Sequence, residues 1–270
     1  MKIAVIIPHK NGGARFERCL ASLIKQPTIE GYDFEFITLD DNGGPGEDFR
    51  IACAYEHDQR FRARYNIRTP GVSGARNTGI ELALTSGADW ITFLDADDTW
   101  LPDATIAIKN AITANEGAQI IELDHLRHYV EVNQTVKKYT IPRSRYKFGT
   151  SNRAWCFVWN KLYKADLIKD IRFIEGLQYG EDEIFNIDAL AKHNEIVHDD
   201  RYIALKRYFD NKQSLSRIKD RYGLLAQNDA LIDALNRHAD QPEIAKNICV
   251  LIGEHWQSPS FLDKFGGGTL

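Results

Sequence analysis

Residues 90–98 read Trp90-Ile91-Thr92-Phe93-Leu94-Asp95-Ala96-Asp97-Asp98. The first five side chains are apolar or β-branched, which predicts a strand buried on both faces of a parallel sheet. Three carboxylates follow this strand within four residues. Because ligands of open parallel sheets bind outside the carboxyl ends of the strands, the run predicts both a fold class and the position of a site.

The alternation of strand and helix extends to both sides of this run. A continuous apolar run predicts a strand at residues 3–7, and further strands are expected at 34–39, 62–67 and 119–123. Apolar residues at helical spacing, and a glycine loop that leads into a helix, predict helices at residues 16–24, 49–61, 71–86 and 101–114. Strands that alternate with helices indicate an α/β fold with a Rossmann-like, mostly parallel sheet flanked by helices.

After about residue 125 the pattern changes. It predicts a β-hairpin or extended segment at 125–146, a helix with an acidic start at 181–190, a strand at 201–209, and helices at 218–238 and 242–255. We therefore expect one domain over residues 1–217, a C-terminal helical extension at 218–265 and a mobile glycine-rich tail at 266–270. The mixed charge of the extension favours packing on the domain or on the partner of a homodimer over contact with a membrane surface.

The composition argues against several classes of protein. The chain has 34 Lys+Arg and 38 Asp+Glu, so it lacks the positive charge typical of proteins that bind nucleic acid through phosphates. One local basic group keeps that alternative open, although a solvated hairpin face also explains it: Lys137, Lys138, Arg143, Arg145 and Lys147. With 43% hydrophobic residues the chain can bury enough apolar surface to fold, which excludes general disorder.

The cysteines and the apolar runs bear on the location of the protein. The four cysteines form no CxxC pair, so they indicate free thiols in a reducing compartment and neither a zinc site nor a disulfide framework. No run reaches the eighteen or so apolar residues of a membrane-spanning helix. The apolar residues 3–7 are too few for a signal peptide. We expect a cytoplasmic protein, with peripheral contact at the inner face of the membrane left open.

The acidic run after the strand at residues 90–94 is a candidate metal site. Asp95, Asp97 and Asp98 repel one another in a dry loop, and a divalent cation bound through oxygen offsets this repulsion. A cation that also bridges two phosphates stabilises a departing nucleoside diphosphate. The alternative is a solvated acidic turn that caps the helix beginning near Leu101.

Two further segments are expected at the same edge of the sheet. Asp40-Asp41-Asn42 ends the strand at 34–39, where a carboxylate can accept from the imide NH of a pyrimidine or from a ribose hydroxyl, unless it forms only an Asx turn. The run 71–77 combines glycines, a helix N-terminus and Arg76, which together can hold a pyrophosphate. It is neither a GxGxxG fingerprint nor a Walker loop.

Five blocks of sequence resemble, in order and spacing, the successive motifs of the family 2 glycosyltransferases. They are Ile6-Ile7-Pro8-His9-Lys10-Asn11, Cys19-Leu20-Ala21-Ser22-Leu23, Leu39-Asp40-Asp41-Asn42, Gly71-Val72-Ser73-Gly74-Ala75-Arg76-Asn77-Thr78-Gly79-Ile80 and Phe93-Leu94-Asp95-Ala96-Asp97-Asp98-Thr99-Trp100. The resemblance covers about the first 105 residues and resumes weakly at 158–163 and 180–185. It implies a GT-A fold, a nucleotide-sugar donor that is most often a UDP-sugar, and Mn²⁺ or Mg²⁺. Residues 1–105 are then the donor half, and 106–217 carry the acceptor side and the catalytic base.

The resemblance also implies roles for single residues. Asp41 contacts the uracil, Arg76 the nucleotide or its phosphates, Asp95 the ribose and the metal, and Asp97 the metal. The pair Glu181-Asp182 resembles the family's catalytic acidic pair, whose aspartate is the general base, although N-terminal capping of a helix is the alternative. The donor site also takes in Pro8, Lys10, Asn11, Gly74 and Ala96.

The chain departs from the family pattern at two places. Lys10 stands where the family commonly has an aromatic residue against the base, so we expect Lys10 to reach a phosphate or a carboxylate instead. The acidic loop reads Asp40-Asp41-Asn42 and continues with Gly-Gly-Pro-Gly, without the usual serine. The nucleotide preference is therefore less firmly implied than the fold.

Several other side chains are candidates for the site. Trp100, Trp155 and Trp159 can form a stacking wall for a sugar ring or belong to the core. His198, or His193, is a candidate further metal ligand, with a structural histidine as the alternative. Arg207 and Ser214 lie where the family often closes over the donor.

These features predict a metal-dependent, inverting glycosyltransferase that acts in the assembly of a cell-surface polysaccharide or glycolipid. Inversion needs one carboxylate to take the proton of the acceptor hydroxyl and no covalent intermediate, which agrees with the lack of a GxSxG nucleophile motif. One alternative is an inactive nucleotide-sugar-binding or scaffold protein of the same fold. Another is a glycosyltransferase that acts on protein or on modified nucleic acid.

Overall fold

The described strands of the computed structural model form one 10-stranded sheet. The structure describes residues 1–137, 144–146, 157–193, 195–209, 221–242, 244–246, 248–249 and 252. The strand order is β3 (Phe61–Tyr65), β2 (Asp33–Asp40), β1 (Lys2–His9), β4 (Trp90–Phe93), β9 (Lys161–Lys164), β6 (Ile120–Tyr129), β10 (Ile196–Phe209) and β5 (Thr99–Trp100). Off this path, β7 (Gln134–Lys137) pairs with β6, and β8 (Ser144–Tyr146) pairs with β10.

The sheet is mostly parallel, as predicted. β3, β2, β1 and β4 pair in parallel, and so do β6 and β10. β9 lies between β4 and β6 and is antiparallel to both, so β4 and β6 point the same way. The carboxyl ends of β1, β2 and β4 therefore lie at one edge of the sheet. The loops that follow these strands carry the first two predicted acidic segments.

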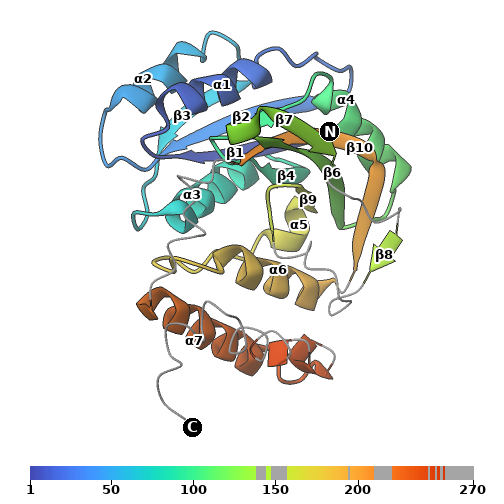
Figure 1. Cartoon of the computed structure of the whole chain (residues 1–270). Coiled ribbons are helices and arrows are strands. Elements are labelled where there is room, and N and C mark those ends of the chain that lie inside the picture. The colour runs from blue at the N-terminus through green and yellow to red at the C-terminus, as the bar shows by residue number, and fades with distance from the viewer. Residues whose placement is uncertain are drawn as a thin grey trace.

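Helices cover both faces of the curled sheet (Figure 1). α1 (Gly13–Leu23), α2 (Glu47–Ala54) and α4 (Ala104–Ala114) pack on one face, and α3 (Val72–Thr85), α5 (Ala165–Ile168) and α6 (Glu181–Lys192) pack on the other. The alternation of β1 supplies both cores, because Ile3, Val5 and Ile7 face the first while Ala4 and Ile6 face the second. The structure thus has the expected α/β/α layers.

The predicted elements differ from the structure in a few places. The helix predicted at 49–61 ends at Ala54, and a series of turns leads to Phe61. The predicted hairpin exists as β6 and β7, joined by the 3-10 turn Val130–Val132. The strands β5 and β9 were not predicted, and β10 begins at Ile196, five residues before the predicted strand at 201–209.

The C-terminal extension packs on the domain. α7 (Arg221–Arg237) lies outside α6 in Figure 1 and buries Leu231 and Ala234 in the core of that face, together with Ile244 and Ile248 further along. The described residues between 242 and 252 are helical, as predicted. The tail at 266–270 and the side chains of the basic group at 137–147 lie outside the described residues.

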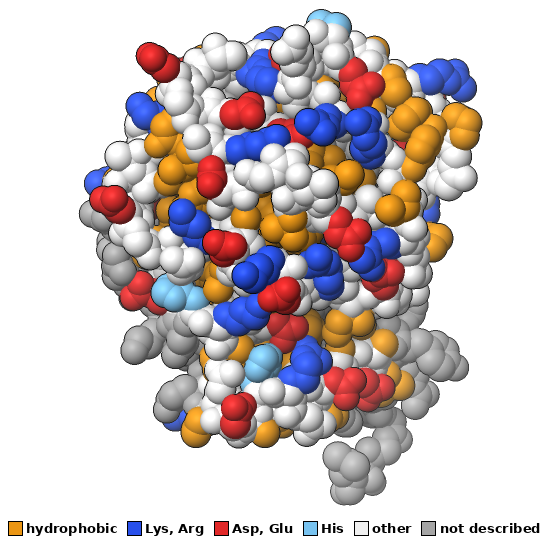
Figure 2. All heavy atoms as spheres, turned by 180° about the vertical axis from the view of Figure 1, so that it is seen from behind, with side chains coloured by type: hydrophobic (Ala, Val, Ile, Leu, Met, Phe, Trp, Pro, Cys, Tyr) orange, Lys and Arg blue, Asp and Glu red, His pale blue; other side chains and the backbone are white. Residues whose placement is uncertain are grey.

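The charge distribution of the surface and the character of the helices complete the description. Figure 2 shows Lys and Arg side chains interspersed with Asp and Glu over the rear face. Among the described helices, none combines the length and the apolar character that a membrane crossing needs.

Candidate active site

The loop that follows β4 gathers three carboxylates at the carboxyl end of the strand. Ligand oxygens of Asp95, Asp97 and Asp98 all lie within 4.8 Å of one another, and among the described residues they form the group that could hold a metal ion. The loop is held by the guanidinium of Arg18, which donates to the carbonyl oxygen of Asp97 at 2.8 Å. Asp98 is fully buried and accepts from the backbone NH of Tyr208 at 2.9 Å, whereas Asp95 and Asp97 are half-buried.

Burial and mutual repulsion disfavour the charged forms of two carboxylates in the acidic loop. Burial, with repulsion by Asp95, raises the pKa of Asp97. Burial raises the pKa of Asp98 to about 8, although the guanidinium of Arg207 opposes the shift. Carboxylate oxygens are the ligands that Mg²⁺ and Mn²⁺ prefer. The donor set therefore fits a divalent cation, and Asp95 and Asp97 are the members that solvent can reach.

Arg76 on α3 joins two of the predicted acidic clusters. Its Nη2 lies 3.3 Å from Oδ1 of Asp95, and its Nη1 lies 3.0 Å from Oε1 of Glu181 and 2.5 Å from Oδ1 of Asp182. The side chain is 5% exposed. Burial opposes its charge, but Asp182, Glu181 and Asp95 together raise its pKa, so it stays a cation. The guanidinium thus places the acidic loop beside the N-terminus of α6.

Glu181 and Asp182 occupy the first turn of α6. Neither carboxylate caps the helix, because the N-cap position is Gly180 and both carboxylates bind Arg76 instead. Burial raises the pKa of Asp182 to about 7; Glu181 and Asp95 add to the shift and Arg76 opposes it. A carboxylate with a pKa near neutrality is suited to accept a proton from a hydroxyl group.

Arg207 on β10 braces the acidic loop from the other side. Its Nε lies 2.9 Å from Oδ2 of Asp98, and its Nη2 lies 3.3 Å from Oδ2 of Asp95. Its guanidinium carbon lies 4.1 Å from the ring centroid of Trp159. Asp95 is therefore held between two guanidinium groups, from α3 and from β10.

Asp41, at the end of β2, closes the N-terminus of α3. The backbone NH of Gly71 donates to both of its carboxylate oxygens, at 3.0 and 2.9 Å. Asn66 donates to Oδ1 at 2.7 Å, and Nζ of Lys10 lies 3.3 Å from Oδ2. The expectation that Lys10 reaches a carboxylate is confirmed. The helix amide that was expected to face a pyrophosphate binds Asp41 in this structure.

The family model described as glycosyl transferase family 2 matches residues 4–170. The chain belongs to this family. A solved structure of Staphylococcus aureus TarS residues 1–349 in complex with UDP-GlcNAc superposes with a TM-score of 0.73 at 18% identity, over 95% of this chain and 73% of that chain. At this identity the likeness shows the fold alone, and it confirms the expected GT-A fold.

Curated relatives agree with the family assignment. EpsJ of Bacillus subtilis, described as an uncharacterized glycosyltransferase, is 29% identical over 236 residues, which are 80% of this chain and 63% of EpsJ. The succinoglycan biosynthesis protein ExoW of Rhizobium meliloti is 32% identical over 151 residues, which are 53% of this chain and 45% of ExoW. This chain therefore spans less than two thirds of the length of these relatives.

The remaining residues of the family 2 motifs lie in or near the loops at the carboxyl end of the sheet, and several have a structural role. Pro8 is buried at the end of β1, Asn11 has a φ of 50° in the exposed loop that follows, and Ala96 is half-buried in the acidic loop. Gly74 is buried where a Cβ would collide with the carbonyl oxygen of Thr69, so its role here is close packing. Asp40 forms the Asx turn that was the alternative for this loop, because its Oδ1 accepts from the backbone NH of Asn42 at 2.8 Å.

The structure does not bring His198 to the acidic loop. Its Nδ1 lies 3.2 Å from Oε2 of Glu122 on β6, and it pairs with Glu122 in the sheet. Arg207, which does reach Asp95, pairs with Arg127, five positions further along β6. At about 3.3 Å per residue this separation is roughly 16 Å, too far for a shared ion. The alternative of a structural histidine fits this position.

The two aromatic candidates that the structure describes are both buried. Trp100 packs edge-on against Phe34 and Phe36, so it belongs to the core. Trp159 is buried beneath Arg207 and leaves little surface for a sugar ring. Trp155 and Ser214 lie outside the described residues. The link that Arg76 makes between the acidic clusters was not predicted, because a basic residue after a glycine loop gives no signal for partners about 100 positions away.

Proposed function

We propose that the chain is a metal-dependent, inverting glycosyltransferase that moves a sugar from a UDP-sugar to an acceptor hydroxyl. The observation that carries the proposal is the guanidinium of Arg76, which contacts Asp95 of the acidic loop and Asp182 of α6. A donor bound at the loop would then have its anomeric carbon near a carboxylate whose pKa is about 7. This is the arrangement that one-step displacement by a hydroxyl group requires.

Each residue has a distinct part in this proposal. Asp95 and Asp97 hold the divalent cation, which supplies Lewis acidity to the departing diphosphate when bound. Asp182 takes the proton of the acceptor hydroxyl as its oxygen attacks the sugar. Arg76 keeps Asp182 in place, and Arg207 adds positive charge beside the acidic loop. Glu181 also pairs with Arg76, and its charge helps to raise the pKa of Asp182.

The proposed donor and acceptor rest on the comparisons with known proteins. A UDP-sugar is supported by the solved TarS structures with UDP-GlcNAc and UDP, and UDP-GlcNAc is the first donor to test. A cell-surface polysaccharide or glycolipid acceptor is supported by the names of ExoW and of TarS, a poly(ribitol-phosphate) beta-N-acetylglucosaminyltransferase. We place the reaction in the cytoplasm, where the free thiols of Cys19, Cys53 and Cys249 stay reduced.

The test is the release of UDP from a panel of UDP-sugars in the presence of Mn²⁺. We expect turnover by the wild-type chain with one of the sugars, and less than about 1% of that rate with Asp182→Asn or Asp97→Asn. Asp103→Asn is the matched control, because Asp103 is exposed and has a φ of 62°, which asparagine tolerates. An inactive binding protein would bind UDP without turnover, and binding of none of the panel would refute the donor assignment.

A further inference from the structure

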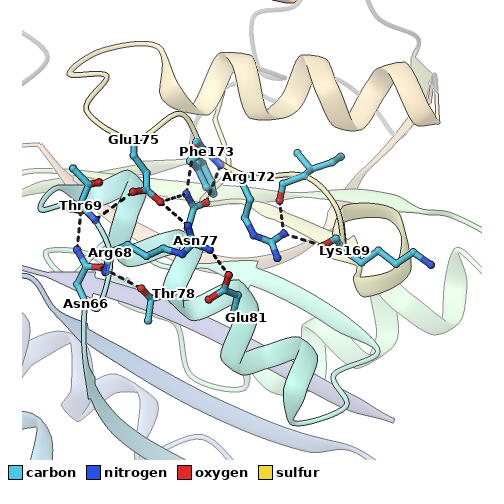
Figure 3. Close-up of polar contacts among 11 residues, drawn as sticks. Asn66, Arg68, Thr69, Asn77, Thr78, Glu81, Lys169, Arg172, Phe173 and Glu175 are labelled. Carbon is cyan, nitrogen blue, oxygen red and sulfur yellow. Dashed lines mark hydrogen bonds and ion pairs between the residues drawn. The ribbon is translucent and has the colours of Figure 1, made fainter. Parts of the chain in front are cut away.

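Asn77, the neighbour of Arg76 on α3, makes two hydrogen bonds to the backbone of the segment that precedes α6. Its Nδ2 donates to the carbonyl oxygen of Phe173 at 2.9 Å, and its Oδ1 accepts from the backbone NH of Phe173 at 2.8 Å (Figure 3). Asn77 is 1% exposed. A short side chain with one donor and one acceptor thus pairs with Phe173 as a strand would.

The ring of Phe173 contacts all three elements that carry the proposed catalytic residues. It stacks on Phe185 of α6, with ring centroids 4.1 Å apart and planes at 7°. It meets Phe93 of β4 edge-on at 5.3 Å, two residues before Asp95. The guanidinium carbon of Arg76 lies 5.2 Å from its centroid. The position of this one ring therefore bears on the acidic loop, on Arg76 and on the helix of Asp182.

The same segment is also joined to the donor side through Glu175. Its Oε1 accepts from Asn77 at 3.0 Å and from Arg68 at 2.9 Å, and its Oε2 accepts from the backbone NH of Thr69 at 3.2 Å. Figure 3 shows these bonds converging on Glu175, two from the loop between β3 and α3 and one from α3 itself. That loop includes Asn66 and ends at Gly71, both of which bind Asp41.

We propose that Asn77 is a positioning residue for the transfer, and that it acts by fixing Phe173. It touches none of the reacting groups in the proposed function, on which this inference rests. By holding Phe173 it sets the distance between the Arg76–Asp95 pair on the donor side and Asp182 at the start of α6. Loss of the hydrogen bonds from Asn77 to Phe173 leaves nucleotide binding nearly intact and lowers the rate of the chemical step.

The amide of Asn77 is suited to this role in a way that other side chains are not. Serine cannot span both backbone groups of Phe173, and glutamine is one methylene longer in a site with almost no exposed surface. Asn115 offers a matched comparison, because it is also a buried amide, at the C-terminal end of α4. Its Nδ2 donates to the carbonyl oxygen of Ala111 and to Asp199, both at 2.8 Å, and neither partner belongs to the proposed site.

The experiment compares Asn77→Ser with Asn115→Ser in the full chain. Binding of UDP with Mn²⁺ is measured by calorimetry, and kcat is measured as UDP release from the best UDP-sugar, well below the lowest melting temperature. We expect Asn77→Ser to bind UDP within threefold of the wild type and to lose at least tenfold in kcat. We expect Asn115→Ser to change both quantities by less than threefold.

A second pair of variants covers the case in which Asn77→Ser does not fold. Phe173→Leu removes the ring but keeps the bonds from Asn77, and Phe34→Leu removes a ring from the opposite core. We expect the same division between binding and kcat for Phe173→Leu alone. Equal kcat values within either pair, or a parallel loss of UDP binding and kcat, would overturn the proposal. A wild type that binds UDP without turnover, or binds none, contradicts the proposed function instead.

Discussion

Nη1 of Arg76 lies 2.5 Å from Oδ1 of Asp182, although the two residues are 106 positions apart in the chain. Both side chains are largely buried, so each would be an uncompensated charge without the other. Because Nη2 of the same guanidinium reaches Asp95, the contact joins the donor side of the proposed site to its base. The fork of an arginine can serve both sides at once, whereas the ammonium of a lysine is a single point of charge.

Arg76→Lys is therefore expected to lower kcat for UDP release by about 100-fold, the usual effect of removing one preorganised donor from an active site. The matched control is Arg60→Lys, because Arg60 also uses its guanidinium for several partners, the carbonyl oxygens of Gln26 and Ile24 and the carboxylate of Asp58. We expect the control to keep more than half of the wild-type kcat. A retained rate in Arg76→Lys would show that the ammonium suffices.

The pH dependence should follow Asp182. Its pKa in the free protein is about 7, raised chiefly by burial, and only the deprotonated form can accept a proton. We expect kcat/KM to rise about tenfold per pH unit below 7 and to level off above it, because kcat/KM reports groups of the free enzyme. Initial rates of UDP release between pH 5 and 9 test this expectation. A profile that is flat from pH 5.5 to 8 would speak against Asp182 as the base.

Metal removal and single substitutions should separate the roles of Asp97 and Asp98 in the acidic loop. We expect EDTA to abolish UDP release and Mn²⁺ or Mg²⁺ to restore it. Asp97→Asn should need at least tenfold more Mn²⁺ for half-maximal rate. Asp98 is buried against Arg207 and the backbone of Tyr208, so Asp98→Asn should instead lower the melting temperature. Full activity of the EDTA-treated protein would contradict the proposed metal dependence.

Much of the fold could be predicted because the central strands are locally distinctive. Residues 3–7 and 90–94 are apolar runs with no other plausible place in a protein of this size, and β1 and β4 occupy them. β9 gave no such signal, since Lys161 and Lys164 flank only two apolar residues. Lys161 is nevertheless fully buried and lies 3.5 Å from Glu122 of β6, a pairing that exists only once the sheet has formed.

The site was predictable in its parts and less so in its connections. The three acidic segments could be read from their places after strands and at a helix start. Which side chains meet was not readable, since Arg76, Asp95 and Asp182 come together only through packing of α3, β4 and α6. The wrong prediction for His198 has the same cause. Its position in the sequence allows a metal ligand, but the register of β10 places its side chain beside Glu122.

Glu175 should contribute stability that depends on pH. Hydrogen bonds from Thr69, Asn77 and Arg68 lower its pKa from 4.5 to about 2. A depressed pKa stabilises the folded state above the unfolded value, and this contribution is lost as the pH falls from about 4.5 towards 2. We expect Glu175→Gln to lower the free energy of unfolding by about 1–3 kcal/mol at pH 7, and by less at pH 3.5.

Urea unfolding of the wild type and Glu175→Gln at both pH values measures this difference. Glu116→Gln is the control, because Glu116 is an exposed carboxylate in the turn that follows α4, and it should differ little from the wild type at either pH. A difference for Glu175→Gln that stays constant between pH 7 and pH 3.5 would show that the bonds act independently of the charge.

Gly180 should be intolerant of a side chain for two reasons that can be separated. It has a φ of 79°, and a Cβ at this position would meet the side chain of Gln227 of α7 at 2.5 Å. Gly176, in the segment before it, has a φ of 82° with nothing within 4 Å of such a Cβ. Gly176→Ala should therefore cost only the strain of a left-handed residue, about 1–2 kcal/mol. Gly180→Ala should cost more, and it should also lower kcat, because Asp182 lies two residues further on.

The additional loss of stability expected for Gly180→Ala should disappear when the side chain of Gln227 is shortened. Adding Gln227→Ala gives up the hydrogen bond from Nε2 of Gln227 to Glu183, at 3.1 Å, but leaves room for the new Cβ. We expect the effect of Gly180→Ala in this background to match that of Gly176→Ala, as seen in urea unfolding midpoints. Equal losses of stability for the two glycine substitutions in the wild-type background would mean that Gln227 of α7 moves aside at little cost. In that case the contact of α7 with Gly180 would not fix the start of α6.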